Sequence, residues 1–465
     1  MYPDWMLTPE VLARLRDALG PDHVLTSGIE KYAHDETEDF EFPPEVVVRP
    51  GSAADVAAVL KIAAAGRIPV TPQAARTSLS GGALCVHGGI ALSMERMARI
   101  KDIDEGNLFC VVEPGVITQT LQEEVERRGL FYGPDPASRG SCTIGGNIAH
   151  NAGGPRALKY GVTKDWVTGL EAVLPSGEII RTGGKLMKNV AGYNLTQLLV
   201  GSEGTLAVVT EATLKLLPKP AFARTLLAPF GDVVSAARAV TEIFKARIVP
   251  CACEYMERAA VEAAERRKGV RLPVSGEAVL LIEVDGNDEP LLDRDAERIA
   301  EICMAAGAPD VFPADDAEKR RFVWDLRRSI GEAVKAMSAY KEEDTVVPRM
   351  RLPDLVQAVR EITKKHGLTA VSYGHVGDGN LHVNILRGNL GEEAWRRGIE
   401  PAVRELFERT VAMGGQITGE HGVGYVQKNY LGIAYPPHYI DLLRSVKKMF
   451  DPLGILNPGK ILPDA

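Results

Sequence analysis

The chain has 465 residues, of which 45% are hydrophobic, 25% charged and 6% aromatic. At roughly 100–200 residues per domain, this length predicts two or three globular domains with a large buried core. Acidic residues number 62 against 54 basic ones, and the net charge of −8 argues against a polyanionic partner such as nucleic acid. Six cysteines are too few for a disulfide scaffold, so a reducing compartment is expected.

The N-terminal residues do not resemble a secretory signal, because Asp4 and Glu10 stand where such a signal needs basic and then apolar residues. The longest uncharged run, Thr77–Met94, contains several glycines and serines as well as His87, so it does not predict a membrane-spanning helix. We therefore expect a cytoplasmic protein that reaches the inner membrane face only through partners.

The first regular elements form a β-α-β unit. Glu45–Pro50 reads as a strand, Ser52 with Asp55 begins a helix that ends at Gly66, and Ile68–Thr71 reads as the next strand. This order predicts a parallel crossover.

A second helix is predicted over Thr118–Arg128, with Gly129 as its stop. Glycine is then dense from Gly133 to Gly204. Short apolar runs lie between and beyond these glycines, which predicts a compact sheet wrapped by functional loops. The runs are Leu170–Leu174, Glu178–Ile180 and Leu206–Thr210.

The segment Pro218–Pro220 marks a domain boundary, because two prolines stiffen the chain there. Beyond it, helices predicted over Ala236–Arg247, Asp293–Ala306 and Arg351–Gly367 alternate with strands such as Ala278–Val284. This pattern indicates an α+β domain built on an antiparallel sheet.

Two glycine pairs within ten residues stand out in Cys142–Ala149 (CTIGGNIA) and Asn151–Gly154 (NAGG). Consecutive glycines let backbone N–H groups converge on an anion such as a pyrophosphate, although a set of tight turns is the alternative. Gly201–Leu206 adds a third glycine loop. Since no dinucleotide-fold or Walker motif is present, a nucleotide cofactor would be held in another way.

A histidine pair follows from a predicted hairpin. The Asp-Gly turn at 378–379 joins strands Ala370–Tyr373 and Leu381–Ile385, which brings His375 and His382 toward each other. Two imidazoles could ligate a divalent metal, although such a pair is more often structural.

Glu420 and His421 lie between glycines in Gly419–Gly424 (GEHGVG). Two histidines plus Glu420 would leave open coordination positions, as catalytic metal sites require.

Four motifs occur in a single order: Cys142–Asn147 (CTIGGN), Gly201–Leu206 (GSEGTL), Gly374–His382 (GHVGDGNLH) and Asp451–Lys460 (DPLGILNPGK). From about Pro43 to its C-terminus the chain therefore resembles the FAD-linked oxidases of the PCMH type, also called vanillyl-alcohol-oxidase-like. This family includes the flavoprotein subunit of bacterial glycolate oxidase, FAD-dependent D-lactate dehydrogenases and D-2-hydroxyglutarate dehydrogenase.

The resemblance implies an α+β fold with three parts. These are a two-subdomain FAD-binding domain at residues 1–220 (core about 43–220), a cap or substrate domain at 221–414 with an antiparallel sheet and helices, and a C-terminal segment at 415–465 that returns to the FAD domain.

The resemblance also implies FAD, and we expect it to be bound without a covalent link, because Gln73–Gly82 lacks the histidine that tethers the flavin in some relatives. The FAD-contacting residues would be Pro72, Gln73, Ala74, Ala75, Arg76, Thr77, Ser78, Ser80, Gly81, Pro136, Ser138, Cys142, Thr143, Gly145, Gly146, Asn147, Ala149, Asn151, Gly153, Gly154, Glu203, Gly204 and Asn457.

By the same resemblance, His375, His382 and Glu420 would hold a divalent metal, with zinc the expected ion and manganese or iron the alternatives. His421 would take the proton of the substrate hydroxyl.

Arg327 would pair with the substrate carboxylate, a role that suits a guanidinium fork, and Asn384 would line the substrate site. The alternative for Arg327 is a solvated charge on a helix, because Arg328 adjoins it.

Two departures from the family pattern matter. Gln73–Ser78 (QAARTS) replaces a glycine-rich first FAD loop, so any position with positive φ would be strained. Gly331 and Glu342 stand where hydroxyglutarate enzymes place a threonine and a lysine for the second carboxylate, so we do not expect hydroxyglutarate as the substrate.

The expected activity is FAD-dependent oxidation of a lactate- or glycolate-like D-2-hydroxy acid to the 2-oxo acid, with hydride passing to flavin N5. Because no iron–sulfur motif is present, an iron–sulfur subunit, an electron-transferring flavoprotein or a quinone would accept the electrons. A homodimer is a further expectation. The alternatives are an oxidase or dehydrogenase of another alcohol, and an electron-transfer flavoprotein subunit without its own substrate.

Overall fold

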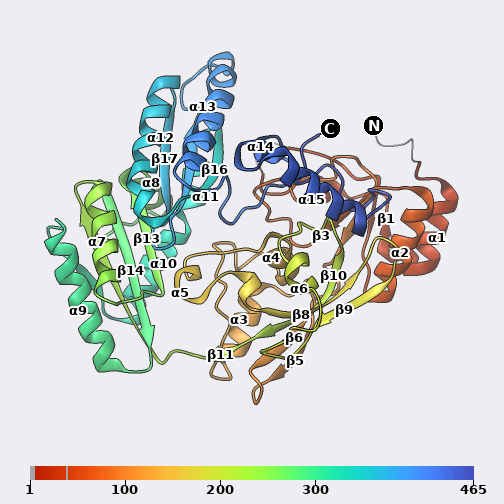
Figure 1. Ribbon diagram of the computed structural model, residues 1–465, viewed down its shortest axis with the longest axis horizontal. Coiled ribbons are helices and arrows are strands. Elements are labelled where there is room, and N and C mark those ends of the chain that lie inside the picture. Colours follow the sequence, from red (N-terminus) through yellow and green to blue (C-terminus); the bar gives the residue numbers. More distant parts are fainter. Residues whose placement is uncertain (1–5, 38–39, 465) are drawn as a thin grey trace. The chain divides into compact units, whose positions relative to one another are not determined.

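The computed structural model describes residues 6–37 and 40–464. These residues form two compact units (Figure 1). Unit 1 is drawn from Met1–Gly153, Gly161–Lys219 and Glu420–Ala465, and unit 2 from Gly154–Tyr160 and Pro220–Gly419. Residues 1–5, on which the prediction of no secretory signal partly rests, lie outside the described residues.

A four-stranded sheet in the order β1-β2-β4-β3 opens unit 1. Its elements, with two helices that pack on it, are α1 (Pro9–Leu19), β1 (Val24–Leu25), β2 (Val46–Val48), α2 (Ala53–Gly66), β3 (Val70–Gln73) and β4 (Ile90–Ser93). Strands β2 and β3 both run parallel to β4. The predicted parallel crossover from β2 to β3 is therefore confirmed, and β4 lies between these two strands in the sheet.

Helix α2 shows how local sequence sets an element's ends. The Ser52 hydroxyl accepts a hydrogen bond from the Asp55 backbone N–H at 3.2 Å, which caps the helix as predicted. At the other end the left-handed residue is Arg67, with φ of 51°, and Gly66 is still helical. The predicted end of the helix at Gly66 is therefore confirmed.

A five-stranded antiparallel sheet in the order β5-β6-β10-β8-β9 follows in unit 1. The three apolar runs predicted among the glycines become its neighbouring strands β8, β9 and β10. Its elements and those near them are β5 (Ile100–Asp104), β6 (Phe109–Val112), α3 (Thr118–Glu126), β7 (Leu130–Phe131), α4 (Ile144–His150), β8 (Val167–Val173), β9 (Ile179–Gly183), α6 (Leu195–Leu199), β10 (Val208–Lys215) and β11 (Leu217–Pro218).

The C-terminal residues complete unit 1 after helices α14 (Leu431–Ala434) and α15 (Pro437–Phe450). Leu456 pairs in parallel with Val70, and Ile455 and Leu456 are buried in the core of the four-stranded sheet. The Asp451 carboxylate accepts hydrogen bonds from both of their backbone N–H groups, at 3.2 and 2.8 Å. The tail is therefore built into this core.

Unit 2 is organised by one seven-stranded antiparallel sheet in the order β15-β12-β14-β13-β17-β18-β16. The α+β class and the antiparallel sheet predicted for this half are confirmed. The strands are β12 (Phe222–Phe230), β13 (Ala252–Glu257), β14 (Ala278–Gly286), β15 (Phe312–Ala314), β16 (Tyr340–Val346), β17 (Thr369–His375) and β18 (Asn380–Leu386).

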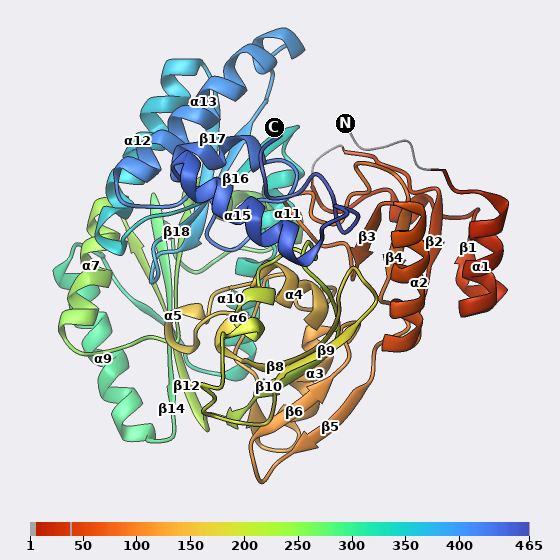
Figure 2. The same ribbon diagram turned by 45° about the vertical axis from the view of Figure 1, so that its right-hand side comes forward.

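Helices cover the seven-stranded sheet. Three of them, α8 (Arg258–Lys268), α10 (Ala317–Arg328) and α11 (Ile330–Lys335), pack into one apolar cluster with Met256 and Tyr373 of the strands. Figure 2 shows α7, α9 and α12 along the opposite side of the strands. The remaining helices are α5 (Ala157–Tyr160), α7 (Val233–Lys245), α9 (Glu289–Ala305), α12 (Leu352–His366) and α13 (Glu392–Ala412).

Among the described residues, no helix has both the length and the apolar character needed to cross a bilayer. All six cysteines are buried. Burial raises the pKa of the Cys251 and Cys253 thiols well above the usual value, which suits ordinary structural cysteines.

Candidate active site

The residues expected to contact FAD belong to unit 1, except Gly154, which falls in unit 2. Pro72 and Gln73 end β3, and Ala74, Ala75, Arg76, Thr77, Ser78, Ser80 and Gly81 form the next loop. Pro136, Ser138, Cys142 and Thr143 precede α4, which contains Gly145, Gly146, Asn147 and Ala149. Asn151 and Gly153 follow it, and Glu203, Gly204 and Asn457 lie farther along the chain.

These segments meet within unit 1. A Cβ added to Gly146 would lie 3.6 Å from Ala74 Cβ, and one added to Gly204 would lie 3.4 Å from Pro72 Cγ. The Asn457 side-chain amide donates to the carbonyl oxygens of Gly82 and Glu203, at 3.0 and 2.7 Å. The first loop, α4, the third glycine loop and the tail are thus neighbours.

The glycine-rich segment Cys142–Ala149 is mostly helix α4, and neither a nest nor a set of tight turns. Gly145 packs so closely on Pro114 that an added Cβ would lie 2.5 Å from the proline Cβ. Thr143 precedes the first turn, and its hydroxyl is buried without a hydrogen-bond partner. A buried hydroxyl donor beside the positive end of a helix fits a phosphate-bearing cofactor such as FAD.

The unusual first loop is strained at one position only. Of residues 73–78, Arg76 alone has a positive φ, at 60°. A left-handed conformation costs a residue with a side chain roughly 1–2 kcal/mol. The Arg76 guanidinium lies 4.8 Å from the centroid of the Tyr32 ring, and such a cation–π contact offsets about 0.5–1 kcal/mol of that cost. Alanine, threonine and serine therefore replace the expected glycines without backbone strain.

Glu203 holds the loop that contains Glu420 and His421. Its carboxylate accepts hydrogen bonds from the backbone N–H groups of Val423 and Gly424, each at 2.8 Å. Burial raises the pKa of Glu203, while His150 and the two backbone donors act in the opposite direction. The sequence predicted a flavin contact for Glu203, and the structure shows that its carboxylate serves the backbone of this loop.

Two further contacts fix the same loop. The Ser80 hydroxyl donates to the His421 carbonyl oxygen at 3.0 Å. Glu420 lies against Gly153, where an added Cβ would come within 2.6 Å of Glu420 Oε2. Both residues therefore lie beside the predicted FAD loops of unit 1, and their side chains are partly exposed.

We predict that Glu203→Gln lowers the free energy of unfolding by about 2–3 kcal/mol. The glutamine side chain has one acceptor oxygen where the carboxylate has two, so its NH₂ group would face one of the two backbone N–H groups. The measurement is the urea midpoint of the purified protein. Glu41→Gln, at an exposed position, serves as the control and should leave the midpoint unchanged. Equal midpoints for Glu203→Gln and the wild type would show that the two hydrogen bonds contribute little.

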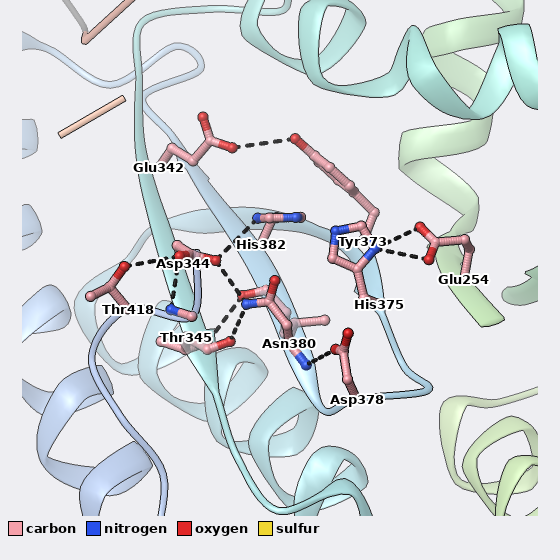
Figure 3. Close-up of polar contacts among 12 residues, drawn as sticks. Glu254, Glu342, Asp344, Thr345, Tyr373, His375, Asp378, Asn380, His382 and Thr418 are labelled. Carbon is pink, nitrogen blue, oxygen red and sulfur yellow. Dashed lines mark hydrogen bonds and ion pairs between the residues drawn. The ribbon is translucent and has the colours of Figure 1, made fainter. Parts of the chain in front are cut away.

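The strand register gathers polar side chains on one face of the sheet in unit 2 (Figure 3). His382 of β18 lies opposite Tyr373 of β17 and opposite Asp344 of β16. Asn384, two residues beyond His382, lies opposite Glu342. Residues that pair directly across antiparallel strands share a face, so all five side chains project to the same side.

His375 and His382 come together across the hairpin, with ring centroids 5.3 Å apart and planes nearly perpendicular. The connection is a four-residue turn rather than a two-residue Asp-Gly turn. Asp378 and Gly379 both donate their N–H to the His375 carbonyl oxygen. Gly379 has φ of 88°, and an added Cβ would lie 2.0 Å from Val347 O, so only glycine fits there.

Glu254 of β13 binds His375. Its two carboxylate oxygens lie 2.8 and 2.9 Å from His375 Nδ1, and Oε2 lies 2.6 Å from a terminal nitrogen of Arg327. Burial acts to raise the pKa of Glu254, but His375 and Arg327 together hold it below its usual value. No motif in the sequence pointed to this residue.

Asp344 of β16 plays a similar part beside His382, whose Nδ1 lies 3.5 Å from Asp344 Oδ1. The carboxylate accepts hydrogen bonds from the Asn380 side-chain amide at 2.7 Å, the Thr418 hydroxyl at 2.9 Å and the Gly419 backbone N–H at 2.8 Å. It is fully buried and was also missed by the sequence analysis.

Arg327 is 4% exposed, so the alternative of a solvated helix charge is wrong. Its guanidinium lies 5.3 Å from the centroid of the Tyr373 ring. Arg327 Nε and both side-chain amide atoms of Asn384 are buried without a hydrogen-bond partner. Buried polar groups are normally hydrogen-bonded, so these atoms indicate a place for a polar ligand.

The comparisons with known proteins assign the chain to a family. Residues 44–183 match the family model described as FAD binding domain, and residues 219–461 match the C-terminal domain of FAD linked oxidases. Glycolate oxidase subunit GlcD of Bacillus subtilis (strain 168) is 42% identical, and the alignment covers 98% of this chain and 97% of that protein. A D-lactate dehydrogenase of Anaerostipes hadrus is 36% identical, with 98% of each chain covered.

Among solved structures, p-cresol methylhydroxylase with substrate bound is similar in fold, with a TM-score of 0.79 at 17% identity, over 98% of this chain and 96% of that chain. At this identity the likeness concerns the fold alone. The two family models together span both units of the chain, and the relatives cover nearly all of it. The chain belongs to the FAD-linked oxidase family and is a FAD-binding oxidoreductase.

Proposed function

We propose that the protein oxidises a D-2-hydroxy acid of the lactate or glycolate type to the 2-oxo acid, with FAD as the electron acceptor. The names of the two relatives, a glycolate oxidase subunit and a D-lactate dehydrogenase, support this substrate class. Each of these substrates combines a carboxylate with a hydroxyl on the adjacent carbon, so the site must recognise an anion and hold a hydroxyl beside it.

The observation that carries the proposal is the pair of unsatisfied groups at Arg327 and Asn384. A buried guanidinium with a free Nε–H calls for an anionic acceptor, and a carboxylate matches its fork geometry. The Asn384 amide, on the same sheet face as His382, can accept from a hydroxyl and donate to an oxygen. Together the two groups suit the carboxylate end of a 2-hydroxy acid.

The two histidines fit a divalent metal, and we assign His375 and His382 as ligands, with Glu420 as the third on the strength of its sequence motif. Their donor set is typical of zinc, and manganese or iron would also accept it. A bound ion would supply Lewis-acid chemistry to the substrate hydroxyl.

His421 is the proposed general base for the hydroxyl proton. A neutral imidazole can accept a proton, and histidine is the side chain that most often does so in catalysis. Bound FAD would supply the two-electron acceptor for the α-hydrogen, received as hydride at N5. The electrons would leave through an iron–sulfur subunit, an electron-transferring flavoprotein or a quinone.

Glu342 favours a monocarboxylate substrate. Its carboxylate lies 3.4 Å from the Tyr373 hydroxyl and 3.4 Å from Lys335 Nζ. Gly331 lies beside the same hydroxyl, because an added Cβ would be 3.3 Å from it. Because Glu342 already occupies Lys335 and the Tyr373 hydroxyl, a second substrate carboxylate would have to compete with it for these groups, so a hydroxyglutarate-like acid should be a poor substrate.

The test is anaerobic mixing of the purified flavoprotein with single 2-hydroxy acids while the flavin absorbance is followed. We expect D-lactate or glycolate to bleach the flavin, and L-lactate and D-2-hydroxyglutarate to act far more slowly. If no 2-hydroxy acid bleached it, the protein would instead be an electron-transfer subunit without its own substrate. Bleaching by other alcohols alone would favour an alcohol oxidase.

We predict that acid precipitation releases all of the flavin. Relatives that tether FAD through histidine carry it in or beside the first loop, but residues 73–82 contain none, and the nearest in the sequence is His87. A cysteine link is also disfavoured, since burial raises the pKa of the nearby Cys85 thiol to about 11. The measurement is flavin absorbance in the supernatant and pellet. Yellow colour left in the pellet would contradict the prediction and would be mapped by peptide analysis.

A further inference from the structure

The carboxylates behind the two histidines have a role of their own. We propose that Glu254 and Asp344 are positioning residues that engage Nδ1 of His375 and His382 and thereby present Nε2 of both rings to the metal. The inference rests on the proposed function, since it concerns the metal ligands assigned there. It adds two residues that neither the sequence motifs nor the relatives' names point to.

The geometry at His375 is the stronger half of the argument. Both oxygens of Glu254 are within 2.9 Å of Nδ1, and the carboxylate is fully buried. An ionised carboxylate can only accept, so Nδ1 must carry the proton of the neutral ring. The lone pair is then on Nε2, which is the arrangement of a carboxylate–histidine–metal triad.

Glu254 is itself held in place. It lies on β13, whose neighbour in the sheet is β17, the strand that carries His375. Arg327 reaches the same carboxylate from α10, at 2.6 Å. A residue fixed by its strand and by a buried cation cannot turn away from the ring, so the orientation of His375 is set before any metal binds.

At His382 a carboxylate also faces Nδ1, but at a longer distance than at His375. Asp344 Oδ2 accepts from Thr418 and Gly419, and Oδ1 accepts from Asn380. Oδ1 also faces His382 Nδ1, at 3.5 Å. Three donors thus orient the carboxylate so that Oδ1 also faces the His382 ring. The longer distance predicts a smaller contribution than that of Glu254.

A simpler explanation makes Glu254 only the counter-ion of Arg327. In that case loss of its charge would disturb Arg327 and substrate affinity, while the metal affinity and the protonated nitrogen of His375 would stay the same. The two explanations therefore differ in measurements that need no turnover.

The first measurement is Zn²⁺ affinity of the FAD-loaded protein, stripped of metal and titrated in competition with a chromophoric chelator. Glu254→Gln should weaken binding by about ten- to a hundred-fold, and Asp344→Asn by less. Glu283→Gln is the matched control: Glu283 is a buried carboxylate in the same sheet, bonded to Trp324 and Thr225 at 2.7 Å each. The Zn²⁺ affinity of Glu283→Gln should equal that of the wild type. Unchanged affinity in Glu254→Gln would overturn the inference.

The second measurement is the ¹⁵N spectrum of histidine-labelled, metal-free protein at alkaline pH, with His382→Ala used to assign His375. We expect the His375 proton on Nδ1, and a redistribution toward Nε2 in Glu254→Gln. A wild-type ring protonated mainly on Nε2 would overturn the inference. The ¹⁵N measurement is separate from the proposed function. If the wild type bound no divalent metal, the metal site of the proposed function would be overturned, but the position of the His375 proton would still be determined.

Discussion

Removal of divalent metal with a chelator is expected to lower 2-hydroxy-acid turnover by at least about a hundred-fold while the flavin spectrum stays the same. Lewis-acid stabilisation of charge on the substrate hydroxyl is worth several kcal/mol, and each 1.4 kcal/mol corresponds to about tenfold in rate. The residues predicted to contact FAD belong almost entirely to unit 1 and do not include the histidines of unit 2. Metal loss should therefore leave FAD in place.

The measurement is steady-state dye reduction before chelation, after chelation and after addition of Zn²⁺ or Mn²⁺, which should restore the activity. His382→Ala should match the stripped protein and should not recover with added metal. His366→Ala is the control, because that histidine ends α12 and bonds to Glu405 at 3.0 Å. If chelators do nothing and active protein contains substoichiometric metal, the two histidines act as direct hydrogen-bond donors to the substrate.

The second large effect is expected for Arg327→Lys, which should lower kcat/KM by roughly ten- to a hundred-fold while FAD and metal remain bound. A lysine keeps the positive charge beside Glu254 but cannot donate two parallel N–H bonds to a carboxylate. A hydrogen bond to a charged group is worth about 1.5–3 kcal/mol, which gives this range.

Steady-state kinetics with the best 2-hydroxy acid from the bleaching screen provide the measurement. Arg328→Lys is the matched control, because Arg328 lies 5.1 Å from the centroid of the Trp324 ring on the same helix. Its kinetics should resemble those of the wild type. An unaffected Arg327→Lys would transfer the carboxylate-binding role to Arg328 or Arg349.

Elements with strong local patterns could be predicted from the sequence, and elements shaped by packing could not. Helix α12 was predicted because Pro353 stands in its first turn and Gly367, with φ of 67°, follows its end. Helix α13 was missed, since Gly398 and Pro401 interrupt its pattern. Gly398 belongs there for tertiary reasons, because an added Cβ would lie 3.2 Å from His366 O of the adjacent helix.

The same distinction applies to the candidate site. His375 and His382 could be paired from sequence because a short turn joins their strands. Glu254 lies 121 positions from His375 and reaches it only through the pairing of β13 with β17. No local pattern encodes that pairing, and the one available hint was a carboxylate between apolar residues in a short strand.

The pairing of Val70 with Leu456 has a consequence for biosynthesis. Ribosomes synthesise the chain from its N-terminus, so the four-stranded sheet emerges long before Ile455 and Leu456, which complete its core. Until Leu456 has emerged, Val70 presents unpaired backbone groups beside an incomplete apolar core. The nascent chain therefore has a period of exposed hydrophobic surface in which chaperones can engage it, and this period closes only when Ile455 and Leu456 have emerged.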